Sequence, residues 1–173
     1  MNASYRMAVA GVSALVLAGC MTTGGSTGLA SKLPESSAAG ARTPTLRPDC
    51  YTVFLHDDPK YVRPGPDTPQ AAAAFLGRWG GGAWNGTVCH DLWVLDVDAA
   101  GGTVLMIDAH GPGLYADATA FRRTGEITED GRLRVEKGRE TVEYWIDDDG
   151  HLQGARFAGG QVIRIVMERR ERP

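Results

Sequence analysis

The chain has 173 residues, of which 18 are Lys or Arg and 21 are Asp or Glu, giving a formal net charge of −3 at pH 7. A weakly acidic chain without a basic block does not have the composition of a nucleic-acid-binding protein, so no nucleic-acid partner is expected. The length accommodates one folded domain of ordinary size.

The N-terminal segment has the pattern of a secretory signal peptide. Arg6 precedes an uncharged run over residues 7–19, which is shorter than the roughly 20 apolar residues that span a bilayer. The run ends in Leu17-Ala18-Gly19-Cys20, which resembles the lipobox of bacterial lipoproteins. The resemblance implies a signal peptide over residues 1–19, cleavage before Cys20, and lipidation of Cys20.

Lipidation determines the expected location. Several acyl chains on one residue anchor a protein stably, so the lipid on Cys20 is the expected membrane contact. Met21 follows the cysteine rather than Asp. By analogy with the family, this favours the outer membrane of the bacterial envelope, with the folded domain in the periplasm.

Residues 20–68 are rich in Gly, Ser, Thr, Ala and Pro. Such a segment buries too little apolar surface to offset its ordering entropy, so we expect a mostly disordered, lipidated tether. Residues 51–55 interrupt it with the β-prone sequence YTVFL. They are expected to form a short strand or a segment laid on the domain surface.

The cysteines indicate a disulfide. With Cys20 assigned to lipid, Cys50 and Cys89 remain as a pair in an oxidising compartment, where such pairs usually form disulfides. We expect a Cys50–Cys89 bond that attaches the end of the tether to the domain.

Residues 69–173 are expected to form the folded domain. Thr68 and Pro69 suit the start of a short helix and Gly77 suits its end. Strand-like runs then alternate with D-G and G-G turn signals, with gaps too short for parallel crossovers. The expected strands cover residues 87–97, 103–110, 119–128, 132–137, 140–146, 151–157 and 161–169. The sequence therefore predicts an all-β fold, a small antiparallel meander β-barrel of about seven or eight strands preceded by one short helix.

Gly77-Arg78-Trp79 after a short helix is similar to the lipocalin opening. That resemblance implies that Trp79 lies at the barrel floor and that a late basic residue, Arg169 or Arg164, packs over it. The order of motifs also resembles small β-domains of bacterial exported proteins, for which no activity is assigned.

A third resemblance concerns the organisation of the chain. A lipid anchor, a small barrel and a cysteine in the strand after Gly-x-Trp are similar to barrel inhibitors of secreted metalloproteases. Those inhibitors carry their second cysteine later in the barrel, whereas this chain has none after Cys89.

Cys89-His90-Asp91 contains the residue types of a thiol hydrolase. Successive strand side chains point to opposite faces, so His90 faces away from Cys89, and a local triad is geometrically poor. We expect a disulfide cysteine beside surface polar residues. The acidic run at residues 147–151 is expected to be a hairpin turn with solvated acids, and residues 134–140 a solvated hairpin.

The loop DAHGPG is the expected rim of a functional barrel mouth, since Asp108 and His110 share one face of a strand end. Trp84, expected to be partly exposed, and Tyr115 are the aromatic candidates for ligand stacking there.

No nucleophile–base set or metal-ligand set stands at usable spacing, so no catalytic residue, metal or cofactor is expected. The expected function is a non-catalytic binding or accessory domain on a membrane-anchored envelope lipoprotein, with a small apolar ligand or an envelope protein as partner. The alternatives are an inhibitor of a secreted protease and a structural envelope component without a small ligand.

Overall fold

The computed structural model describes residues 43–171, apart from residues 54, 56–57, 99 and 115. The predicted signal peptide, Cys20 and Tyr115 lie outside the described residues. Among the described residues, no helix is long and apolar enough to cross a membrane.

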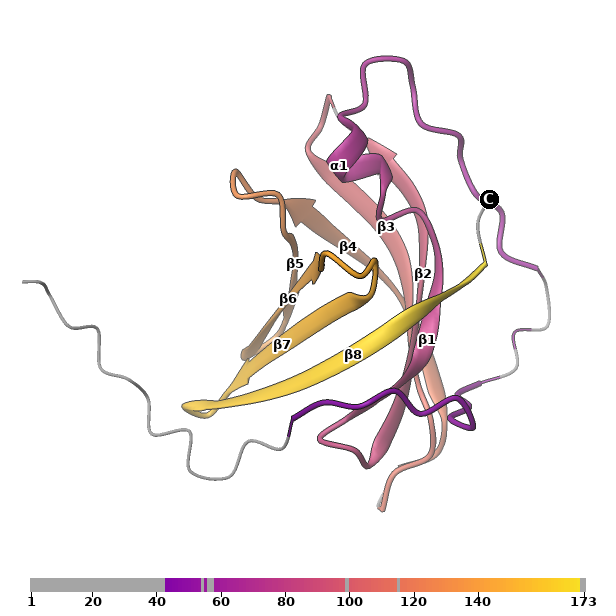
Figure 1. Cartoon of the computed structure of the whole chain (residues 1–173), viewed down its shortest axis with the longest axis vertical. Coiled ribbons are helices and arrows are strands. Elements are labelled where there is room, and N and C mark those ends of the chain that lie inside the picture. The colour runs from indigo at the N-terminus through magenta and orange to yellow at the C-terminus, as the bar shows by residue number, and fades with distance from the viewer. Residues whose placement is uncertain (1–42, 54, 56–57, 99, 115, 172–173) are drawn as a thin grey trace, which may run out of the picture. The chain divides into compact units, whose positions relative to one another are not determined.

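Eight antiparallel strands form one closed barrel in chain order, each paired with the next and β8 paired with β1 (Figure 1). The elements are α1 (Gln70–Ala73), β1 (Gly77–Trp84), β2 (Val88–Asp98), β3 (Thr103–His110), β4 (Thr119–Ile127), β5 (Leu133–Lys137), β6 (Glu140–Ile146), β7 (Leu152–Ala158) and β8 (Gln161–Glu171). The predicted all-β meander barrel is confirmed. Glycines with positive φ, such as Gly131 and Gly150, occupy the tight turns that the D-G pairs indicated.

The short helix differs in detail from the prediction. It begins after Pro69, which is the N-cap, and no side chain caps it, so the predicted cap by Thr68 is wrong. Gly77 does not end the helix, which closes at Ala74, but starts β1 with a φ of 113° that only glycine adopts readily.

Trp79 is fully buried, and its Nε1 donates a hydrogen bond of 2.7 Å to the Phe75 carbonyl. The Arg169 guanidinium lies 4.0 Å from the centre of the Trp79 ring and donates hydrogen bonds to the Leu76 and Ala74 carbonyls. Of the two arginines proposed from the lipocalin resemblance, Arg169 is therefore the one over the tryptophan.

The barrel interior is filled by buried apolar side chains from every strand except β4, whose part-buried Ile127 packs against them. These inward-facing residues include Leu92, Val94, Val104, Met106, Leu133, Val135, Val142, Tyr144, Leu152, Ile165 and Met167. These side chains pack against one another as an ordinary hydrophobic core.

The last part of the expected tether lies against the outside of the barrel, and we call residues 47–62, where described, the strap. The Arg47 amide donates to the Gly81 carbonyl at 2.6 Å, and the Val62 amide donates to the Leu95 carbonyl at 2.8 Å. A disulfide joins Cys50 to Cys89, as predicted. Gly111 lets the strap approach, since a Cβ there would lie 2.6 Å from the Tyr51 carbonyl oxygen.

Beneath the strap, the outer face of β2 and β3 carries a second apolar cluster. Its members are Trp93, Leu95, Ile107 and Ala109, with Val53, Leu55, Tyr61 and Leu105 packed against them. The strap therefore buries an apolar sheet face that would otherwise be in contact with water.

Candidate functional site

Polar side chains occupy one end of the barrel interior. Strand alternation places His90 on the same face as Leu92, and Asp108 on the same face as Met106. The cluster, which we call the polar end, consists of His90, Asp108, His110, Arg123, Lys137, Tyr144 and Arg156 together with Trp84. Seven strands, β1 to β7, therefore contribute to one interior site.

The Asp108 carboxylate is the centre of the polar end, and it is completely buried. Its Oδ2 accepts from Arg123 Nε at 2.7 Å and lies 2.6 Å from Lys137 Nζ. Its Oδ1 lies 3.3 Å from His110 Nε2 and 3.5 Å from His90 Nδ1, and makes no hydrogen bond of good geometry. Two cations therefore hold one oxygen, while two imidazoles face the other.

The electrostatics follow from this arrangement. Burial acts to raise the pKa of Asp108, but contact with the His110 ring and the charge of the Lys137 ammonium outweigh it and bring that pKa far below its ordinary value. Burial lowers the pKa of Lys137, against the raising effect of the Asp108 charge. The polar end thus keeps a buried carboxylate ionised.

His90 is fully buried among aromatic side chains. Burial lowers its pKa well below the ordinary value, although the Asp108 charge acts in the opposite direction. Its Nε2 lies 3.1 Å from the Tyr144 hydroxyl, and its ring centre lies 4.8 Å from that of His110 and 5.4 Å from that of Trp84. His90 is therefore a neutral imidazole at neutral pH, with Nδ1 directed at Asp108.

The structure corrects several expectations about these residues. His90 and Asp91, expected at the surface, are buried, and Trp84, expected to be partly exposed, is 3% exposed. Asp108 lies inside the barrel rather than on an exposed rim, while His110 beside it is part-buried. Lys137, placed in a solvated hairpin, has a side chain only 9% exposed.

Cys89-His90-Asp91 is divided between the two faces of β2. Cys89 is bonded to Cys50, and His90 points into the barrel. Asp91 points outward beneath the strap, where it accepts from Arg78 Nη2 at 2.8 Å and from Thr52 Oγ1 at 3.1 Å. Cys89 therefore forms a disulfide, His90 is a polar group of the barrel interior, and Asp91 binds the strap. The three residues do not form one site.

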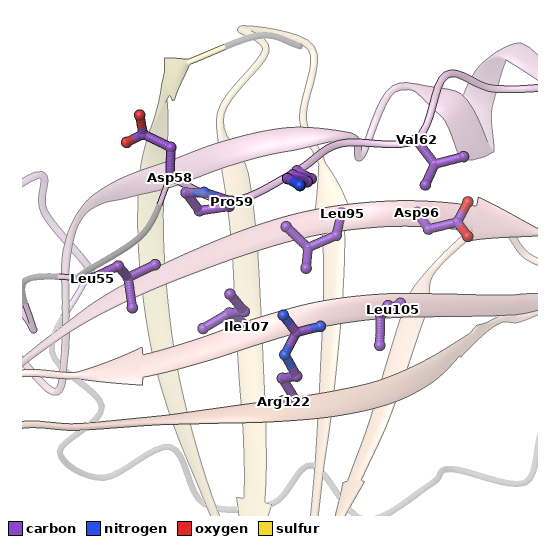
Figure 2. A pocket seen from close by; sticks show the side chains of 10 residues that line it. Leu55, Asp58, Pro59, Val62, Leu95, Asp96, Leu105, Ile107 and Arg122 are labelled. Atoms are coloured by element: carbon purple, nitrogen blue, oxygen red, sulfur yellow. The ribbon is translucent and has the colours of Figure 1, made fainter.

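An outer groove with a volume of about 1000 Å³ lies between the strap and strands β2–β4 (Figure 2). Leu95, Leu105 and Ile107 form its apolar floor, and Figure 2 shows Arg122 reaching over that floor from β4. The strap contributes Leu55, Asp58, Pro59, Lys60 and Val62, and β2 adds Asp96. An apolar floor with a charged rim is the usual composition of a protein-binding surface.

Among the residues that the structure describes, strand β4 is paired along only one edge for most of its length. Its ladder with β3 runs over Thr119–Glu126, whereas its ladder with β5 has only the pairs Glu126↔Arg134 and Ile127↔Leu133. Thr119 to Arg122 and Thr124 are exposed, including the Phe121 side chain at 47%. Residues 119–125 therefore form an edge within an otherwise closed barrel, which we call the β4 edge.

The acidic run at residues 147–151 forms a hairpin turn, as expected. Asp147 accepts hydrogen bonds from the amides of Asp149 and His151 and from Gln153 Nε2 at 2.7 Å. The carboxylate of Asp147 is thus used to shape the turn.

No family model, no curated protein and no solved structure matches the chain. The geometry of the polar end, the groove and the β4 edge is therefore the basis for assigning a function.

Proposed function

We propose that this protein is a lipid-anchored accessory protein of the bacterial envelope whose barrel binds an extended segment of another envelope protein along the β4 edge, without catalysing a reaction. The lipobox motif ending in Cys20 supports the anchor. The Cys50–Cys89 disulfide accords with an oxidising compartment such as the periplasm.

The β4 edge is the observation that carries the protein-binding part of the proposal. An edge strand presents a row of unpaired N–H and C=O groups, and an extended peptide binds by adding a strand to it. Natural edge strands are usually short, bulged or covered, whereas β4 has an unbroken register with β3 from Thr103↔Glu126 to His110↔Thr119. Phe121 adds an exposed apolar anchor on this strand.

The rest of the domain favours a protein over a small apolar ligand. Large side chains fill the interior near Trp79, and the apolar groove that the structure does have lies on the outside, under the strap. A partner protein could therefore pair its backbone with the β4 edge and contact the apolar floor of the outer groove.

The test is site-specific photo-crosslinking in living cells from Thr124, which is exposed on β4. A discrete adduct should form and should weaken at least fivefold in Phe121→Asp, because the charge opposes docking of an apolar segment. Phe157→Asp is the matched control, since Phe157 is exposed to a similar extent, 40%, on β7. Loss of the adduct in both variants, or absence of any adduct, would contradict strand addition at β4.

The anchor is tested separately. Labelled palmitate should enter the protein and should be absent from a Cys20→Ala variant. Labelling that persists in that variant would rule out lipidation at Cys20.

A further inference from the structure

We propose that His90 Nδ1, Asp108 Oδ1 and His110 Nε2 form a binding site for a divalent first-row transition metal ion, such as Zn²⁺, at the polar end of the barrel. The three atoms belong to neighbouring strands, and all lie within 4.8 Å of one another. Arg123 of the β4 edge contacts the Asp108 carboxylate, but the site does not depend on the proposed function.

The spacing of the three atoms suits a small metal ion. Oδ1 of Asp108 lies 3.5 Å from His90 Nδ1 and 3.3 Å from His110 Nε2. Ligands about 2.0 Å from a tetrahedral zinc ion are separated from one another by about 3.3 Å. Two of the three ligand separations therefore match this geometry, and the third lies within 4.8 Å.

The bonding state of two of these atoms points to the same site. His90 Nδ1 and Asp108 Oδ1 are buried, lie 3.5 Å apart, and make no hydrogen bond of good geometry with any described residue. Buried polar atoms are nearly always satisfied, so a lone pair on each side of a short gap indicates a cation between them, either a proton or a metal ion.

The surrounding groups resemble a second coordination shell. Tyr144 Oη lies 3.1 Å from His90 Nε2 and can accept a hydrogen bond from an Nε2–H group, which leaves the lone pair on Nδ1 for a metal ion. Lys137 and Arg123 hold the other oxygen, Oδ2, and so fix the orientation of the carboxylate. Two imidazoles and one carboxylate favour a transition metal over Ca²⁺ or Mg²⁺, which prefer oxygen ligands.

The charges nearby set the expected affinity. Lys137 and Arg123 repel a dication, so we expect binding in the micromolar rather than the nanomolar range. His110, whose side chain is 21% exposed, is the ligand that an ion reaches first.

The experiment is a Zn²⁺ titration of the full-length, oxidised protein in detergent, followed by Co²⁺ substitution and visible spectroscopy. We expect one ion per chain, an absorption band of four-coordinate Co²⁺, and at least a tenfold loss of affinity in His110→Ala and Asp108→Asn. His151→Ala is the control, because His151 belongs to the other grouping of potential ligands, with Asp147 and Asp149, and should leave the titration unchanged.

Asp108→Asn removes the negative charge that pairs with Lys137 and Arg123 and so also destabilises the fold. His110→Ala leaves these ion pairs in place and tests the metal ligand alone. Absence of binding up to 100 µM Zn²⁺, or binding that is lost in His151→Ala but retained in His110→Ala, would overturn the site. In that case the cation between His90 and Asp108 is a proton.

Discussion

Asp108 shows how a single buried carboxylate organises its surroundings. Groups from β2, β3, β4 and β5 all converge on its two oxygens. A buried charge persists only when paired and hydrogen-bonded, so Arg123 and Lys137 offset the cost of burying it. Conversely, the buried Lys137 depends on Asp108.

The substitution Asp108→Asn should therefore destabilise the fold strongly. It leaves the Lys137 ammonium buried without its counter-charge, and breaking a buried pair typically costs about 3–5 kcal/mol. The free energy of unfolding in urea measures the change. Asp130→Asn is the control, because the Asp130 side chain is 63% exposed, and it should change stability by less than about 0.5 kcal/mol. A similar small change in both variants would show that Asp108 does not organise the core.

His90 makes stability depend on pH. In the unfolded chain this histidine titrates near 6.5, whereas in the folded protein burial lowers its pKa well below that value. The unfolded state therefore binds more protons below pH 6.5, and stability should fall as the pH decreases from 7 to 5, by at most about 1.4 kcal/mol per pH unit from this group. The groups that face His90 are Asp108, His110, Lys137, Tyr144 and Trp84.

Urea unfolding at several pH values tests this dependence. The slope between pH 5 and pH 7 should be smaller in His90→Gln than in the unaltered protein, because glutamine does not titrate. An equal slope in both proteins would show that another group is responsible. Protonation of Asp108 does not affect this window, because the unfolded chain titrates that carboxyl near 3.8 and the folded protein lower still.

At the scale of the elements, turn chemistry and alternation were sufficient to predict the barrel. The predicted strand at residues 103–110 coincides with β3, and that at 140–146 coincides with β6. These strands have regular alternation and glycine-containing turns, so local sequence determines their limits. The short helix was less predictable, because its start depends on how α1 packs over Trp79 rather than on a side-chain cap.

The candidate site was only partly predictable. The position of Asp108 and His110 on one strand face indicates the site, whereas the predicted surface position of His90 is wrong, because His90 shares a face with Leu92 and Val94. Lys137 likewise shares a face with Leu133 and Val135. Strict use of alternation would have placed both residues inside. Which strands face each other across the barrel depends on closure, which no local pattern encodes.

The Cys50–Cys89 disulfide attaches the strap to strand β2. The bond closes a loop with a sequence separation of 39, which corresponds to about 4 kcal/mol in the chain-entropy model. The double substitution Cys50→Ser and Cys89→Ser should lower the free energy of unfolding by about that amount and speed amide exchange at Val62, which bonds to Leu95. Unchanged exchange at Val62 would show that the apolar cluster alone holds the strap.

At the scale of the whole molecule, the barrel has two different ends. One is closed by Trp79 beneath the Arg169 guanidinium, and the other contains the polar end around Asp108. Between them, the wall is continuous except where β4 leaves β5 after Glu126↔Arg134. The proposed lipid anchor would hold this wall at a membrane surface, where partners for an edge strand are other envelope proteins.

The central claim is that β4 has a free edge that a partner's strand completes, and amide hydrogen exchange along residues 119–125 of the isolated protein tests it most directly. Because one edge of β4 is paired with β3 and the other is open, amides should alternate between slow and fast exchange along the strand. The fast amides should become protected when the crosslinked partner is bound. Uniformly slow exchange along β4 in the isolated protein would contradict the claim, because the edge would then already be paired.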